Sequence, residues 1–185
     1  MQLSTRLGRR IAVGLGLAGT AILLPTAALA SSGHAGAAAH AAAAPACTSN
    51  HTRVWWGEPG DAATGHIHYP LQFSNIGTTT CTLFGYPGVS ALDTNGNQVG
   101  LPATHSGAKQ LVTLAPGATA HVILDVTQGA FVCSNPIDAP VLRVFAPGQV
   151  NAQLVPLATT GCPGQSVLHV DAMHPRAGIP GVTNS

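Results

Sequence analysis

Short segments in which every second residue is apolar constrain the fold of this chain more than any other feature. Residues 66–74 alternate apolar side chains with polar ones or proline, residues 120–126 do the same, and Leu142 and Val144 flank Arg143. Successive side chains of a strand point to opposite faces, so these segments predict strands with one buried face. No helical period of 3.6 extends over three turns after the first thirty residues. The sequence therefore predicts an all-β fold.

Turn residues separate these segments. Asn95-Gly96, between residues 89–92 and 98–99, is the strongest hairpin signal. Pro70 cannot donate to a ladder, so we expect its strand to lie at an edge or to bend there. Further turns are expected at residues 75–77, 116–117 and 147–148. Seven to nine short strands predict an antiparallel β-sandwich, immunoglobulin-like in architecture but without the Cys, Trp, Cys spacing of antibody domains.

The N-terminus carries the pattern of an export signal. Arg6, Arg9 and Arg10 precede an apolar run at residues 11–24, and small residues end at Ala30. This pattern predicts a signal peptide over residues 1–30, cleaved after Ala30, and both general secretion and twin-arginine export fit it. The apolar run is shorter than the roughly 20 residues of a membrane span. We expect a secreted or envelope-associated protein whose mature chain has no integral membrane segment.

Four cysteines remain in the predicted mature chain. An even number in an oxidising compartment predicts two disulfides. Three connectivities are possible, and we favour the sequential pairing because it closes the shorter loops. Zinc binding is the alternative, but the chain contains no CxxC motif and the spacings are wide. The cysteines are Cys47, Cys81, Cys133 and Cys162.

Composition divides the rest of the chain. Residues 31–46, rich in Ala, Gly and His, predict a flexible tether; residues 47–172 predict the β-sandwich domain; residues 173–185, with two Pro and two Gly, predict a flexible tail. The mature chain keeps four scattered basic residues against six acidic ones, a net charge of −2 with neutral histidines. A nucleic-acid partner needs clustered Lys and Arg, so none is expected.

Four segments carry a family resemblance. They are residues 69–75 (YPLQFSN), 80–89 (TCTLFGYPGV), 112–117 (VTLAPG) and 142–144 (LRV). In this order, with four cysteines and an Ala-rich tether after a signal peptide, they resemble the secreted actinobacterial family called domain of unknown function 4232, over residues 47–172. The resemblance implies an exported β-sandwich, often tethered to the envelope or released from it, with no established activity. It supplies no catalytic residues.

Two histidines suggest a metal site. His66 and His68 lie two residues apart, so in a strand they share a face and could present two imidazoles to copper or zinc. His121 is expected on an outward strand face, but a third ligand is undefined. The alternative, a solvated polar face, is the one we expect, with no metal or other cofactor. The sequence does not place His51, His105 or His169.

Trp55 and Trp56 give the best indication of binding. Adjacent residues of a strand face opposite ways, so one tryptophan is expected to be exposed. An exposed Trp can stack on a sugar or anchor a protein contact, unless residues 57–65 cover it. We therefore expect an exported, non-catalytic interaction module whose partner is an unknown protein or glycan of the cell envelope.

Two other functions stay open. One is an extracytoplasmic metal-binding accessory protein that uses surface histidines, and the other is a secreted hydrolase. The sequence has no G-x-S-x-G elbow, no HExxH and no paired carboxylates near a histidine. No catalytic residue is predicted, and the protein is not expected to be an enzyme.

Overall fold

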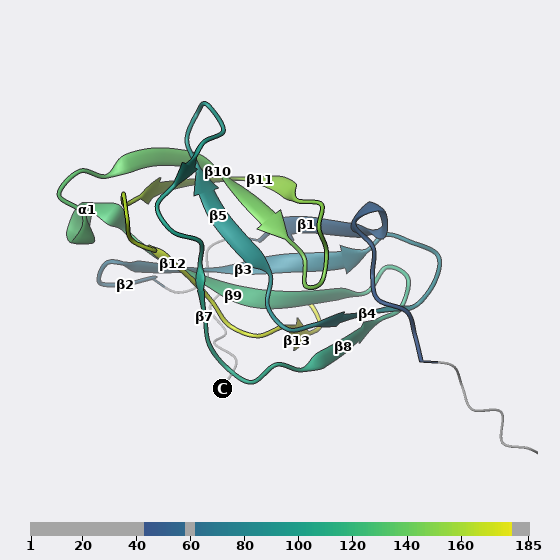
Figure 1. Cartoon of the computed structure of the whole chain (residues 1–185). Coiled ribbons are helices and arrows are strands. Elements are labelled where there is room, and N and C mark those ends of the chain that lie inside the picture. Colours follow the sequence, from purple (N-terminus) through teal and green to yellow (C-terminus); the bar gives the residue numbers. More distant parts are fainter. Residues whose placement is uncertain (1–42, 58–61, 179–185) are drawn as a thin grey trace, which may run out of the picture. The chain divides into compact units, whose positions relative to one another are not determined.

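Strands form nearly all the regular structure of the computed structural model, which describes residues 43–57 and 62–178 (Figure 1). Besides them, the described residues form a single 3-10 turn, η1 (Ser49–His51), and a single short helix, α1 (Gly129–Val132). The strands are β1 (Thr52–Trp56), β2 (Ala62–Ala63), β3 (His66–Asn75), β4 (Cys81–Phe84), β5 (Gly88–Leu92), β6 (Gln98–Val99), β7 (Thr104–His105), β8 (Leu111–Leu114), β9 (Thr119–Thr127), β10 (Ile137–Phe145), β11 (Gln153–Gly161), β12 (Leu168–Val170) and β13 (His174–Pro175).

The strands form three sheets. The largest has the order β1-β3-β9-β12-β7, with β2 paired to β3 and β13 paired to β9. A second sheet has the order β11-β10-β5-β6, and β4 pairs with β8 in the third. Within the described residues every strand pair is antiparallel except β12 and β7. The mostly β composition and the antiparallel sheets are thus confirmed. Strands of only two residues raise the number above the expected seven to nine.

One hydrophobic core is shared by all three sheets. Phe73 of β3, Leu142 of β10 and Leu83 of β4 are each at most 1% exposed and belong to the same cluster of buried side chains. Burying a side chain of this size contributes roughly 1.5–3 kcal/mol, so a core drawn from three sheets fixes them against one another.

Pro70 lies in an interior strand, contrary to the expected edge. β3 has β1 on one side and β9 on the other. The Gly57 N–H donates to the Pro70 carbonyl at 3.3 Å, so the Pro70 nitrogen also faces the β1 side. β1 has already ended at Trp56, and the missing donor therefore removes no bond to β9. Of the two expectations for this strand, an edge or a bend, the edge is wrong, because a proline disturbs only the neighbour that its nitrogen faces.

The predicted hairpin is confirmed. β5 and β6 pair antiparallel, and Gly96 adopts a φ of 80° in the turn between them. The Asp93 carboxylate accepts hydrogen bonds at 2.8 Å from the backbone N–H groups of Asn95 and Asn97. Those bonds hold the turn in place and lower the pKa of Asp93.

Both favoured disulfides are present. Cys47 bonds to Cys81, and Cys133 bonds to Cys162. The first bond lies beside a backbone pairing that the tether prediction missed: Ala46 bridges Thr82, whose N–H donates to the Pro45 carbonyl at 2.8 Å. A flexible tether is therefore wrong for residues 45 and 46. The predicted signal peptide and residues 31–42 of the tether lie outside the described residues.

The C-terminal segment is also more ordered than expected. Met173 is fully buried, and β13 pairs with β9. The Gln72 side chain donates to the Gly178 carbonyl at 3.0 Å and accepts from the Gly178 N–H at 3.1 Å. A flexible tail is thus wrong for residues 173–178, because their backbone finds partners on the sheet despite the Pro and Gly content. Residues 179–185 lie outside the described part of the chain.

Helices contribute little to the described part of the chain. None of the helices there is long and apolar enough to cross a membrane.

Candidate functional site

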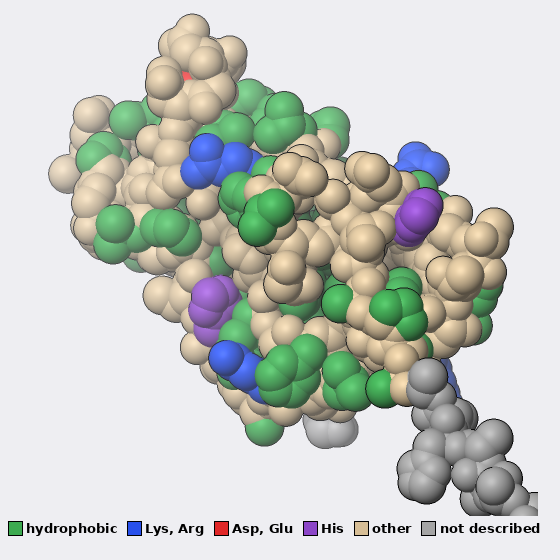
Figure 2. Space-filling model, turned by 45° about the vertical axis from the view of Figure 1, so that its right-hand side comes forward, with side chains coloured by type: hydrophobic (Ala, Val, Ile, Leu, Met, Phe, Trp, Pro, Cys, Tyr) green, Lys and Arg blue, Asp and Glu red, His purple; other side chains and the backbone are tan. Residues whose placement is uncertain are grey.

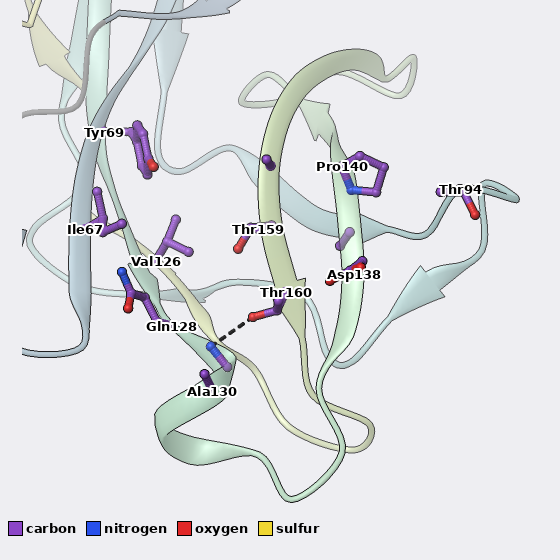
Figure 3. Close-up of a pocket in the computed structure, with 13 residues that line it drawn as sticks. Ile67, Tyr69, Thr94, Val126, Gln128, Ala130, Asp138, Pro140, Thr159 and Thr160 are labelled. Carbon is purple, nitrogen blue, oxygen red and sulfur yellow. Dashed lines mark hydrogen bonds between the residues drawn. The ribbon is translucent and has the colours of Figure 1, made fainter.

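A cavity of about 620 Å³ lies beside β3 and β9 of the large sheet and β10 and β11 of the second sheet, next to α1 (Figure 3). Ligand cavities in proteins commonly have volumes of roughly 300–1,000 Å³. The cavity is lined by Ile67, Tyr69, Thr94, Val126, Gln128, Gly129, Ala130, Asp138, Ala139, Pro140, Ala158, Thr159 and Thr160.

The alternating pattern of β3 positions the first wall. Ile67 and Tyr69 lie two residues apart and so share a face, and Ile67 is in register with Val126 of β9. The Trp56 ring packs edge-on against Tyr69, with the ring centroids 5.5 Å apart. Figure 3 shows Tyr69, Ile67 and Val126 together on one side, with Thr159 on β11 facing them. Trp56 therefore helps to hold Tyr69 in the cavity wall.

The end of the cavity near α1 is tied to the second sheet. The Gly129 N–H donates to the Thr160 hydroxyl at 2.9 Å, and the disulfide between Cys133 and Cys162 joins the end of α1 to the residue after β11. A Cβ at Gly129 would overlap the Thr160 hydroxyl, so this position requires glycine. These bonds fix α1 as one boundary of the cavity.

Several neutral polar side chains in the cavity wall are uncommitted. The Tyr69 hydroxyl, the Gln128 amide and the Thr159 hydroxyl make no side-chain hydrogen bond to any described residue. Burial raises the pKa of Tyr69, so its hydroxyl stays protonated and can donate as well as accept. Asp138, which is exposed, is the one charged residue in the described lining.

Apolar side chains are exposed next to the cavity. Phe131 and Val132 of α1 are 66% and 46% exposed, and they directly follow the lining residues Gly129 and Ala130. Exposed apolar side chains beside a cavity are typical of binding regions, whereas scattered single ones need no explanation. Apolar side chains therefore continue from the cavity lining onto the neighbouring surface.

The two tryptophans face opposite sides, as predicted. Trp55 is 38% exposed, and its Nε1–H donates to the Ser74 hydroxyl at 3.0 Å. Trp56 is half-buried, packs against the core and donates from Nε1 to the Pro156 carbonyl. Of the two, Trp55 is the candidate for a surface contact, while Trp56 packs against the core and Tyr69.

The predicted histidine pair shares a face and lies against a carboxylate. His66 Nδ1 is 2.9 Å from an Asp125 carboxylate oxygen, and His68 Nε2 is 3.8 Å from the same oxygen. β12 brings His169 into register with Asp125, but the His169 nitrogens contact the hydroxyls of Thr104 and Ser106, each at 2.8 Å. Among the described residues, no group of three or more His, Cys, Asp or Glu suits a metal ion. The third ligand that the metal hypothesis needs is therefore not found there.

His121 lies on the outward strand face, as expected, but the side chain is buried there by a segment that packs over it. It is only 4% exposed, its Nδ1 lies 2.8 Å from the Arg176 carbonyl, and its ring stacks on His174 at 5.3 Å. The segment that carries Arg176 and His174 covers this face of the sheet, which the sequence pattern could not show. Burial, the largest cause, lowers the pKa of His121. Of the other histidines in the described residues, His51 contacts Thr48 and His105 contacts the Pro87 carbonyl.

Charged side chains do not gather on the surface that Figure 2 shows. The blue side chains of Lys and Arg are separated from one another in that view, which is not the pattern of a phosphate-binding surface.

The sequence interpretation missed the cavity and the partner of the histidine pair. The cavity walls come from four strands whose order no local pattern reveals. Strand alternation predicts that Ile67, Tyr69 and Val126 face inward, and this is the one available signal. Alternation in residues 120–126 places Asp125 on the outward face, but its position opposite His68 depends on the pairing of β3 with β9.

Comparison with known proteins gives one match. A family model described as domain of unknown function (DUF4232) matches residues 47–174. No curated protein and no solved structure shows significant similarity. The match ends two residues beyond the body that the sequence predicted, within the C-terminal segment that pairs with β9.

Proposed function

The chain belongs to the DUF4232 family, a domain of unknown function, and from that premise we propose that it is a non-catalytic binding domain. Its ligand occupies the cavity between β3 and β9 on one side and β10 and β11 on the other. The cavity itself carries this proposal: apolar walls with a few neutral polar groups are the usual composition of a small-molecule site.

The chemistry of the lining supports binding without catalysis. The described lining residues include one carboxylate and no His, Cys or Lys. General acid–base or nucleophilic catalysis needs a pair of such groups within hydrogen-bond reach. His66 and Asp125 form such a pair, but Ile67 faces the cavity and strand alternation directs His66 to the other face.

The proposal includes export and an immunoglobulin-like sandwich. Two disulfides and the absence of a membrane-spanning helix in the described residues are consistent with an extracellular protein. The signal pattern before Ala30 supports export, and the resemblance to secreted actinobacterial proteins supports an envelope or extracellular location. A core shared by antiparallel sheets supports the sandwich.

A neutral fluorescent dye tests the proposal. Nile red fluoresces strongly in apolar surroundings, so the purified protein without the apolar signal segment of residues 1–30 should bind it at one saturable site. Thr159 is in register with buried Ala139, hence it faces inward, and Thr159→Phe should fill the cavity and abolish the signal. Leu154→Phe is the matched control on the same strand, because Leu154 is 66% exposed and lies outside the lining.

The two variants distinguish dye binding in the cavity from dye binding on the surface. Equal dye binding by Thr159→Phe, Leu154→Phe and the unmodified protein would contradict the proposal. Far-UV circular dichroism of each variant confirms that the fold is intact.

A further inference from the structure

We propose that the cavity selects an uncharged amphipathic molecule, with an alkyl chain and a hydroxyl or carbonyl group, and discriminates against anions. This inference rests on the proposed function, because it names the ligand class for the same cavity. The structural basis is the combination of apolar walls, uncommitted neutral polar groups and the absence of any cation from the described lining residues.

The apolar part of the ligand is defined by both walls. Val126 and Tyr69 of the large sheet are 4% and 8% exposed, and Ala139 of the second sheet is fully buried. An alkyl chain placed between them replaces contact with water by contact with these side chains, which is the driving force of apolar binding. Charged groups inserted there would lose hydration without gaining a partner.

The polar part of the ligand is defined by the uncommitted groups. Tyr69, Thr159 and Gln128 together offer hydroxyl and amide groups that donate and accept, and none of the three is charged. They match a hydroxyl or a carbonyl, each of which needs one or two hydrogen bonds. A carboxylate or phosphate is usually bound by Arg, Lys or several backbone N–H groups, and the described lining has no Arg or Lys.

The nearby charges act against an anion. Asp138 lines the cavity, and Asp93 immediately precedes the lining residue Thr94. Backbone hydrogen bonds lower the pKa of Asp93, so it remains ionised at neutral pH. The carboxylates of exposed Asp138 and half-buried Asp93 repel an anion, whereas their attraction for a cation is weakened by solvent. A cation buried between the apolar walls would lose more hydration than this attraction returns.

Displacement of Nile red by three molecules of equal chain length tests the inference. 1-Decanol, decanoate and decylammonium are titrated at pH 8 against the protein without residues 1–30. Decanoate and decylammonium are kept below their micelle concentrations, and decanol is kept below its solubility limit. We expect decanol to displace the dye at a concentration at least about tenfold lower than decanoate or decylammonium, because the charged ends must be desolvated.

Tyr69→Phe tests the hydrogen-bonding part. Removing the hydroxyl should weaken decanol binding by about fivefold, the effect of one hydrogen bond, without lowering the melting temperature. Tyr86→Phe is the control, because the Tyr86 hydroxyl donates to the Gly107 carbonyl and Tyr86 does not line the cavity. It should leave decanol binding unchanged.

The possible outcomes are distinct. Decanoate or decylammonium binding as tightly as decanol would overturn the inference, as would unchanged decanol binding by Tyr69→Phe. Dye binding that none of the three molecules displaces would also overturn it while leaving the proposed function in place. If the protein binds neither dye nor decanol, the proposed function itself fails.

Discussion

At the scale of single residues, burial and pairing decide what each candidate side chain can do. Trp55 and Trp56 are neighbours of the same type in one strand, yet one is exposed and the other supports Tyr69. His66 and His121 both sit on the outward face that the sequence predicted, yet only His121 is covered. Residue type and strand phase were therefore predictable, whereas exposure depended on which segment packs above.

Truncation to alanine should reduce stability by different amounts at the two tryptophans. Trp56→Ala removes a ring that packs on the core and should lower the free energy of unfolding by about 3 kcal/mol. Trp55→Ala removes a more exposed ring and one bond to Ser74, so a loss of at most about 1 kcal/mol is expected. Urea denaturation measures both.

Retention of the same variants on envelope material is a second measurement, which tests Trp55 as a binding contact. If Trp55 is a surface contact, Trp55→Ala should weaken retention on such material by about 2 kcal/mol. Equal destabilisation by the two substitutions, with normal retention of both folded variants, would remove Trp55 as a contact.

At the scale of elements, the C-terminal segment adds strands and contacts to the large sheet that the alternation pattern does not predict. Alternation predicted β3 and β9 and their inward faces, because one face of each is apolar. It could not predict that β12 and β13 pair with β9 in the sheet or that Gln72 is buried, since strand order depends on contacts between distant segments. The same limit explains why alternation predicts that Ile67, Tyr69 and Val126 face inward but does not predict the cavity that they line.

His121 should make stability depend on pH. Burial lowers its pKa in the folded protein below the ordinary value of 6.5. Between these two values the unfolded chain binds a proton that the folded chain does not. The free energy of unfolding should thus be at its full value above pH 6.5 and fall as the pH drops toward the folded pKa.

Substitution of His121 tests this dependence. His121→Gln should reduce the loss of stability between pH 7.5 and pH 5.5, because Gln can still donate to the Arg176 carbonyl and does not titrate. His51→Gln, at an exposed position, serves as the control. Identical pH dependence of the unmodified protein and His121→Gln, measured by urea denaturation, would show that His121 is not responsible.

Truncation tests the contribution of the C-terminal segment. A chain that ends at Ala172 loses the buried Met173 side chain, the pairing of β13 with β9 and both bonds to Gln72. We expect a loss of at least about 3 kcal/mol, because a core methionine and a buried amide lose their partners. A chain that ends at Gly178 retains all these contacts and is the matched control; equal stability of the two truncated chains would refute the expectation.

At the scale of the whole molecule, two disulfides and one core hold three sheets together. Cys47 and Cys81 join the N-terminal segment to the two-stranded sheet, and Cys133 and Cys162 join the α1 region to the second sheet. In the chain-entropy model, loops of this size contribute roughly 3–4 kcal/mol each. The pairing was predictable from loop length, whereas the structures that it connects were not.

The mature protein should contain no free thiol and should begin at Ser31. All four cysteines are paired, and the small residues that end at Ala30 predict the cleavage site. Intact mass spectrometry of protein recovered from the culture medium, with and without reductant and a thiol-specific alkylating agent, measures both properties. Alkylation without reductant, or a mass that includes residues 1–30, would contradict the prediction.

Pro70 has a consequence for how molecules of this protein meet one another. β1 and β2 pair with the same side of β3, one on each side of Pro70 along the strand. Pro70 has no N–H to offer between them, so this side of β3 cannot present an uninterrupted row of donors and acceptors to a strand from another molecule. Pro70 thus removes no hydrogen bond within the sheet, and its missing N–H disfavours aggregation by strand pairing along this side of β3.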